Sequence, residues 1–191
     1  MQKNIIKKES GYTILETMIA ISLFIVIVMA GMGALLNANL LSKKSQSMRS
    51  IMDNLSYVVE DMGRNLRTGY AYHCIADGNL TLTTPLSCAS GGGISFKSSL
   101  GGQWVYYIGT YAGKPGIFKS VDGGVTFVQM NPDEVTLSAV SGFSVLGAEP
   151  PAGDTQQPFV TIKLVGTITL NATTTTTFSL QTSVSQRVID L

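Results

Sequence analysis

The 191-residue chain is poor in charge and in the side chains that most often perform chemistry. Charged residues make up only 13% of it, about half the share usual in soluble proteins, and the net charge is +1. Such a balance gives no overall attraction to nucleic acid or to an anionic membrane surface. His73 is the single histidine, and two cysteines alone cannot complete a tetrahedral zinc site. These shortages argue against an enzyme and predict neither a cofactor nor a metal.

The apolar residues are concentrated near the N-terminus. Residues 17–41 contain no charged side chain, and residues 18–36 are apolar except for Ser22. As a helix rising about 1.5 Å per residue, this run is long enough to cross about 30 Å of hydrocarbon. A removable secretory signal has an apolar stretch of only about 7–15 residues followed by an Ala-x-Ala-like site. The run is longer and no such site follows it, so the pattern favours a membrane-spanning helix.

The residues before the apolar run form an ordered pattern. A basic leader, MQKNIIKKES, is followed by Gly11, aromatic Tyr12 and then Glu16. This pattern resembles the signal of type IV prepilins and type II secretion pseudopilins, which a prepilin peptidase cuts after the glycine on the cytoplasmic side and methylates at the new N-terminus. The resemblance implies a leader of residues 1–11, cleavage between Gly11 and Tyr12, and N-methylation of Tyr12. The family more often has Phe at this last position.

Glu16 stands directly before the uncharged run. An unpaired carboxylate in or near hydrocarbon is costly and needs a compensating partner. The resemblance implies that Glu16 pairs with the N-terminal amine of a neighbouring subunit and sets the register of assembly. The residues by themselves also allow a simpler interpretation, in which Glu16 is an acidic residue favoured at a helix N-terminus by the macrodipole.

The positive-inside rule does not orient the helix. Three lysines precede the apolar run, and Lys43, Lys44 and Arg49 follow it closely, so the two sides are almost equal. The processing signal instead implies a single-pass protein of the cytoplasmic membrane with its N-terminus in the cytoplasm. The remainder then lies outside that membrane, and in an extracellular or periplasmic filament after assembly.

Beyond residue 41 the helical pattern continues with one apolar stripe. Its members recur every three or four residues, at Ile51, Leu55, Val58, Met62 and Leu66. The pattern predicts one helix from residue 13 to about 67, with residues 12–41 as its assembly half and 42–68 as an amphipathic half. Gly69 is the expected C-cap.

Residues 54–74, which include Arg64 and Arg67, and the closing segment 178–191 are similar to J- or W-type minor pseudopilins and minor pilins. The two arginines are equally consistent with cations that match the C-terminal end of the helix dipole.

Residues 69–191 read as a β-rich globular domain, because short apolar runs alternate with turn residues. The turn signals are GG at 101–102, KPG at 114–116 and DGG at 122–124, and residues 149–158 read as a surface loop. The predicted class is α+β, with an antiparallel sheet packed on the amphipathic half of the helix. The expected strands are residues 94–97, 104–109, 117–121, 125–130, 135–137, 143–146, 159–165 and 178–184.

Cys74 and Cys88 lie in a loop-rich stretch. In a domain outside the cytoplasmic membrane, two such cysteines are expected to form a disulfide. A metal site with His73 is the other possibility, but chelation by the adjacent His73 and Cys74 would strain the backbone, and a fourth ligand is missing.

The function that these features favour is a structural, minor subunit of a type IV pilus or type II pseudopilus. Its expected partners are other subunits, the prepilin peptidase, the inner-membrane assembly platform and, before assembly, membrane lipid. An adhesin-type minor pilin and a membrane-anchored protein that never polymerises remain alternatives. No nucleic acid is expected, because residues 68–191 carry five basic and seven acidic residues and no basic stripe.

Overall fold

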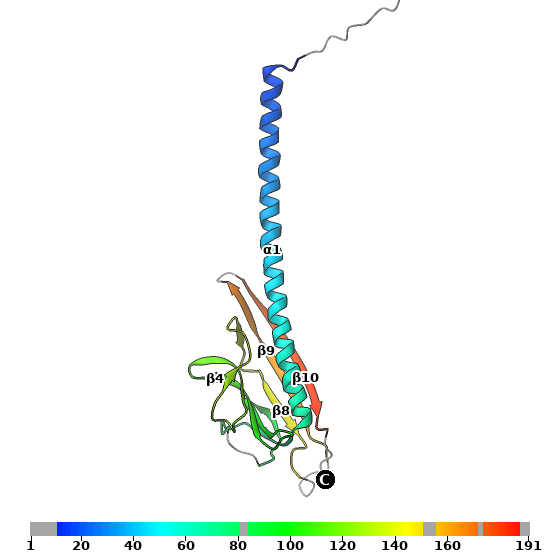
Figure 1. The fold of residues 1–191 in the computed structure, drawn as a ribbon, viewed down its shortest axis with the longest axis vertical. Coiled ribbons are helices and arrows are strands. Elements are labelled where there is room, and N and C mark those ends of the chain that lie inside the picture. Colours follow the sequence, from blue (N-terminus) through cyan, green and yellow to red (C-terminus); the bar gives the residue numbers. More distant parts are fainter. Residues whose placement is uncertain (1–10, 81–83, 151–155, 172–173, 188–191) are drawn as a thin grey trace, which may run out of the picture. The chain divides into compact units, whose positions relative to one another are not determined.

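The computed structural model describes residues 11–80, 84–150, 156–171 and 174–187. The chain divides into two compact units, residues 1–46 and 47–191, and the boundary lies within helix α1 (Ile14–Thr68). The helix agrees with the predicted limits to within one residue at each end. All the described strands belong to the second unit, and the predicted α+β class is confirmed (Figure 1).

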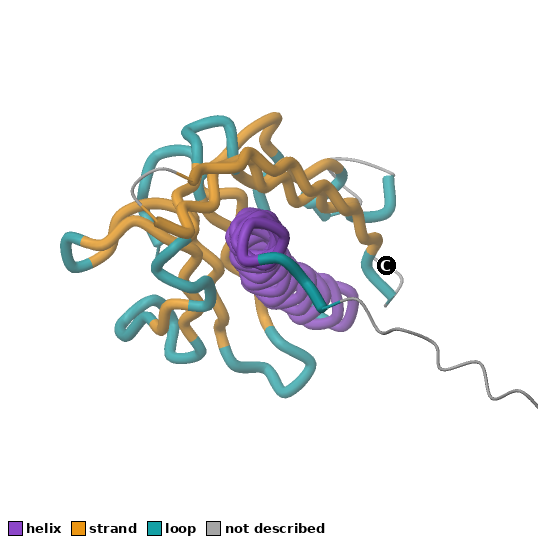
Figure 2. Tube along the Cα trace, turned by 90° about the horizontal axis from the view of Figure 1, so that it is seen from above, coloured by secondary structure: helices purple, strands orange, loops and turns teal. Residues whose placement is uncertain are grey.

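The second unit is built around the amphipathic part of α1. The five residues of the predicted stripe, spaced three or four apart, are all buried, and Gly63 beside them is buried as well: Ile51, Leu55, Val58, Met62, Gly63 and Leu66. They form one apolar core with the inward-facing residues of the strands. Figure 2, seen from above, shows the strands curving around the helix.

The strands form two antiparallel sheets rather than one. One has the order β1-β3-β4-β5-β6; the other has the order β10-β9-β8-β2, with β7 also paired to β9. Their bounds are β1 (Tyr70–Ile75), β2 (Cys88–Gly91), β3 (Gly93–Lys97), β4 (Gln103–Tyr111), β5 (Lys114–Ser120), β6 (Val128–Gln129), β7 (Val135–Leu137), β8 (Gly142–Leu146), β9 (Phe159–Asn171) and β10 (Thr174–Ser185).

Two strands were not expected from the sequence, and both lie at a sheet edge. Strand β1 follows the helix after the single residue Gly69, where a loop was expected. Strand β2 has the sequence CASG, whose small and polar residues give no alternating apolar pattern. The two edges also lie near each other, since Cys74 N donates to Leu86 O over 3.0 Å and His73 forms an isolated bridge with Leu86. Strand β1, by contrast, has the sequence YAYHCI, whose tyrosines and isoleucine do favour a strand, so only β2 lacked a local signal.

The KPG turn prediction is wrong. Residues 114–116 lie inside β5, and the hairpin turns one step earlier at Ala112 and Gly113. Both residues have positive φ, of 50° and 80°, as a type I′ hairpin turn requires. Positive φ is energetically costly for Ala112 because it has a Cβ atom. The seven residue pairs formed between β4 and β5 offset this cost.

The expected strand 125–130 shortens to β6, at Val128–Gln129. The reason is the Asp122 carboxylate, which accepts hydrogen bonds from the backbone N–H groups of Val125 (3.2 Å) and Thr126 (2.9 Å). These contacts satisfy the backbone locally and hold a turn in place of a strand. They also keep the pKa of Asp122 well below its usual range, with the Thr126 hydroxyl as the largest contributor.

The end of α1 is closed by side chains of the β domain. The Tyr72 hydroxyl lies 2.5 Å from the Leu66 carbonyl oxygen and 2.9 Å from that of Gly69. It thereby gives a hydrogen-bond donor to carbonyl groups that have no partner within the helix at its C-terminal end. Gly69 does follow the helix directly, but its φ is not positive. Its importance is packing, because a Cβ there would lie 2.5 Å from the Phe96 ring.

A half-buried polar network joins α1 to the first sheet. Lys119 Nζ lies 2.9 Å from Asp61 Oδ2 and 4.7 Å from the centre of the Trp104 ring. Asp61 also accepts hydrogen bonds from Asn65 (3.1 Å) and from the Tyr106 hydroxyl (3.3 Å). Burial, as the largest cause, raises the pKa of Tyr106 far above its usual range.

Candidate functional site

The predicted cleavage position lies in non-helical chain just before α1. Gly11, Tyr12 and Thr13 precede the first helical residue, and all three are exposed. The Tyr12 side chain is 83% exposed, and nothing lies within 4 Å of a Cβ built on Gly11. The Gly11–Tyr12 peptide bond is therefore accessible in this structure. The rest of the predicted leader, residues 1–10, lies outside the described residues.

Thr13 forms the N-cap of α1, a role that sequence reasoning missed. Its hydroxyl accepts a hydrogen bond from the backbone N–H of Glu16 over 3.3 Å, and its carbonyl accepts the N–H of Thr17 over 3.2 Å. Thr-x-x-Glu is the sequence pattern of a capping box, so the signal was present in residues 13–16. Glu16 thus stands in the first turn, where the helix dipole favours a carboxylate.

Glu16 is exposed, and neither of the ion pairs among the described residues includes it. The first-turn position agrees with the simpler interpretation of this residue. It leaves the carboxylate open to a second molecule as well, so the capping role and a pairing role do not exclude each other.

The first unit presents a continuous apolar surface. Seventeen large apolar side chains between Tyr12 and Leu41 are 46–83% exposed, and α1 is long and apolar enough to cross a membrane. An apolar surface of this extent is typical of a membrane or of a large protein interface. Such a surface is stabilised when lipid or protein removes it from water.

The two cysteines are paired, as expected, and their bond joins the two sheets. Cys74 lies in β1 of one sheet and Cys88 in β2 of the other, with Cα atoms 5.8 Å apart. In this pair both sulfur atoms are engaged in the disulfide, and a disulfide supplies no thiolate ligand. His73 is buried and its Nδ1 lies 2.6 Å from the Thr84 carbonyl oxygen. The described residues hold no group of three or more His, Cys, Asp or Glu side chains placed to bind a metal.

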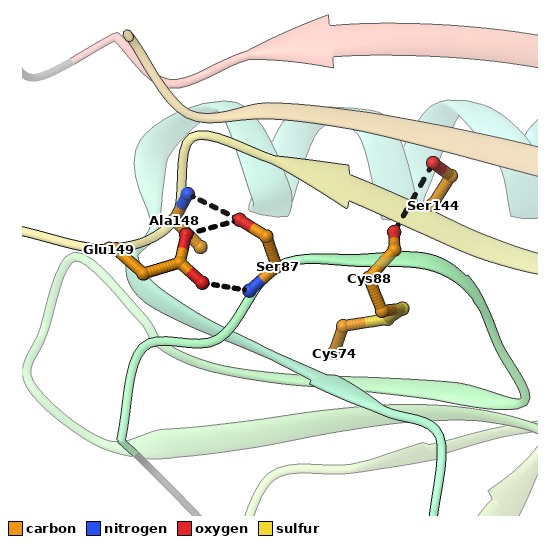
Figure 3. The surroundings of a disulfide bond; sticks show 6 residues. All are labelled: Cys74, Ser87, Cys88, Ser144, Ala148 and Glu149. Atoms are coloured by element: carbon orange, nitrogen blue, oxygen red, sulfur yellow. Dashed lines mark hydrogen bonds between the residues drawn. A yellow bond between two sulfur atoms is a disulfide. The ribbon is translucent and has the colours of Figure 1, made fainter. Parts of the chain in front are cut away.

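A carboxylate clamp holds the chain next to this disulfide (Figure 3). Glu149 accepts the backbone N–H of Ser87 over 2.8 Å and also accepts its hydroxyl, while Ser87 Oγ accepts the N–H of Ala148 over 3.0 Å. The Ser87 hydrogen bonds, that of the side chain first, lower the pKa of Glu149. The Ser144 hydroxyl donates to the Cys88 carbonyl over 3.4 Å. Side-chain hydrogen bonds therefore hold both Ser87 and Cys88, where β2 begins.

The two arginines of the proposed minor-subunit resemblance line a groove between α1 and β10. Arg64 pairs with Glu60 over 3.3 Å at the surface, and the Arg67 carbonyl accepts the backbone N–H of Arg187 over 2.8 Å. The groove encloses about 500 Å³, with Val59, Gly63, Leu180 and Val184 among its lining residues. It contains no set of groups suited to acid–base or nucleophilic chemistry.

No protein-family model, characterised protein or solved structure matches this chain.

Proposed function

We propose that this protein is a prepilin-type structural subunit, matured by cleavage after Gly11 and assembled through residues 12–41. The observation that carries the proposal is the order of its N-terminal features. A basic leader, Gly11, Tyr12 and Glu16 precede an uncharged helical run, and the Gly11–Tyr12 bond lies in exposed chain. The proposal places the N-terminus in the cytoplasm and residues 69–191 outside the cytoplasmic membrane.

The exposed apolar surface supports an assembly role. Side chains such as Ile14, Phe24 and Leu35, which are 66–81% exposed, require either lipid or other helices around them. A subunit that exchanges lipid for neighbouring helices keeps these residues out of water in both states. Both the hydrocarbon of a membrane and the core of a helical filament require an apolar helix surface. The same sequence can therefore be stable in either surrounding.

The Glu16 carboxylate supplies a means of fixing axial register. Cleavage after Gly11 creates a cationic amine on Tyr12, and methylation keeps its charge. Pairing of that amine with Glu16 of a neighbour neutralises both charges in an apolar surrounding, where a lone carboxylate is costly. The ectodomain features around Arg64 and Arg67 favour a minor subunit.

The decisive measurement is the mass of the N-terminal peptide. The full chain is expressed in bacteria with an active prepilin peptidase, and membrane and sheared-filament fractions are mapped separately. We expect a terminus at Tyr12 carrying one added methyl group, and its presence in filaments distinguishes a polymerised subunit from a membrane reserve. Gly11→Val blocks cleavage, whereas the matched control Gly31→Ala is processed normally. A wild-type chain that still begins at Met1 contradicts the proposal.

Register is tested separately from processing. Glu16→Gln is expected to be cleaved like the wild type but to enter filaments at least about ten-fold less, because the partner amine loses its counter-charge. Glu134→Gln, the same chemical change at an exposed position of the β domain, serves as the control. Equal incorporation of wild type and Glu16→Gln would show that this carboxylate only caps the helix.

A further inference from the structure

Lys43 and Lys44 stand immediately after the apolar run, on the exposed surface of the first unit. Both side chains are exposed and lie two and three residues beyond Leu41, or about 3–5 Å farther along the helix. If residues 17–41 fill the hydrocarbon, these amines lie at the depth of the lipid head groups, which add roughly 5–8 Å on each side. Lysine stems are long enough to adjust the exact depth of the charge.

Neither lysine has an acidic neighbour on the helix. The positions three and four residues away on either side carry no Asp or Glu, and Glu16 is the only acid in residues 12–52. Glu16 lies 27 residues before Lys43, about 40 Å away along the helix axis. The ion pairs of the described residues are Glu60–Arg64 and Asp61–Lys119, and they leave both lysines out. Their charge is therefore uncompensated within the first unit.

We propose that Lys43 and Lys44 bind the anionic head groups of phospholipids in the leaflet where α1 leaves the membrane. The inference rests only on that part of the proposed function that places residues 17–41 in a bilayer, and not on cleavage or polymerisation. Charge complementarity selects the occupant: a second copy at the same depth presents lysines to lysines, whereas anionic lipid supplies the missing phosphate charge. Bound lipid then also relieves repulsion between copies that approach each other in the membrane.

The test measures lipid selectivity of the full chain. The protein is reconstituted in phosphatidylcholine vesicles containing a few spin-labelled lipids, and electron paramagnetic resonance reports the fraction held at the protein surface. We expect labelled phosphatidylglycerol to associate about five-fold more strongly than labelled phosphatidylcholine at low salt. The double variant Lys43→Gln/Lys44→Gln is expected to bring that ratio close to one, and Lys43→Glu/Lys44→Glu to bring it below one.

The matched control is Lys114→Gln/Lys163→Gln, which removes two exposed lysines from the β domain and keeps the wild-type ratio. The wild-type preference also falls at about 1 M salt, where the screening length is about 3 Å. A wild-type ratio of one, or an unchanged ratio in Lys43→Gln/Lys44→Gln, overturns the inference and leaves the membrane helix intact. Failure of the wild-type chain to enter vesicles overturns both the inference and the membrane anchor of the proposed function.

Discussion

At the scale of single residues, Glu149 shows how one carboxylate organises an irregular segment. Its two oxygens accept the N–H and the hydroxyl of Ser87, and those hydrogen bonds lower its pKa. A carboxylate whose pKa is lower in the folded state stabilises the fold above its unfolded pKa, near 4.5, and loses that contribution as the pH falls through its folded value. The residue next to Cys88 is thus held more firmly at neutral than at acid pH.

The hydrogen bonds of the Glu149 carboxylate should make the melting temperature depend on pH. Glu149→Gln is expected to lower Tm at pH 7, and the difference from wild type should shrink as the pH falls below about 4.5. Thermal unfolding followed by circular dichroism between pH 3 and 7 provides the profile. Ser87→Ala, which removes the hydroxyl contact with Glu149, should also make Tm depend less on pH than it does in the wild type. A difference in Tm that is constant over the whole range would contradict the clamp.

At the scale of elements, the apolar contact of α1 with the first sheet is supplemented by one half-buried ion pair. The Asp61 and Lys119 side chains are only 25% and 23% exposed, and Asn65 and Tyr106 complete the hydrogen bonding of the carboxylate. Glu60–Arg64, one residue earlier on the same helix, is 72% exposed on both sides and is screened by water. The two pairs therefore allow a half-buried carboxylate–cation pair to be compared with an exposed one on the same helix.

Removing the cation from each pair tests this comparison. Lys119→Met keeps an aliphatic stem against Trp104 but leaves the half-buried Asp61 without its counter-charge, and we expect a loss of about 1–3 kcal/mol of unfolding free energy. Arg64→Met should cost no more than about 0.5 kcal/mol. Denaturant titration of both variants gives the values. The interpretation fails if the two losses are equal, and Asp61→Asn combined with Lys119→Met measures the coupling directly.

At the scale of the whole molecule, the disulfide is a covalent crosslink between the two sheets and not within one of them. It joins β1 and β2, which are edge strands of different sheets, across a sequence separation of 14. Chain-entropy reasoning assigns a loop of this length about 3 kcal/mol, because the crosslink restricts the unfolded chain. In the folded state the crosslink lies at the first residue of β2, whose register with β8 is irregular between Cys88 and Gly91.

Breaking this crosslink should destabilise the β domain as a unit. Cys74→Ala/Cys88→Ala is expected to lower the unfolding free energy by about 2–5 kcal/mol, measured by denaturant titration of the full chain in detergent. A reducing agent should lower the stability of the wild type by a similar amount and have no effect on the double variant. Equal stability of wild type and variant in the absence of reductant would show that packing alone holds the two edges together.

Strong periodic signals predicted most of the architecture. The limits of α1, its apolar stripe and the existence of the eight expected strands could be predicted because each depends on spacing within a short window. The strand limits were less accurate, since β5 begins three residues before the expected residue 117 and β6 keeps only two of its six expected residues. Leader cleavage, methylation of Tyr12 and the pairing of Glu16 stay predictions, since they concern a second molecule or residues 1–10.

The missed features have different origins. Strand β2 was not predicted because its sequence CASG has little strand propensity, whereas β1 was missed although the tyrosines and isoleucine of YAYHCI favour a strand. The turn at Ala112–Gly113 was misassigned because a non-glycine residue there adopts positive φ, at a cost that only the paired strands offset. Thr13 was overlooked as a cap although its pattern was visible.

The sequence by itself determined the long helix, its division into an exposed apolar half and a half with one apolar stripe, and the β-rich class of the remainder. Those properties follow from the order of apolar and polar residues, which can be recognised within one or two helical turns or within a single strand. Only the tertiary structure decided that the strands form two sheets, that the disulfide joins them, and that Asp61 rather than Glu60 holds a protected cation. Each of these depends on groups far apart in the chain coming together, and the free energy of such contacts has no local signature in the sequence.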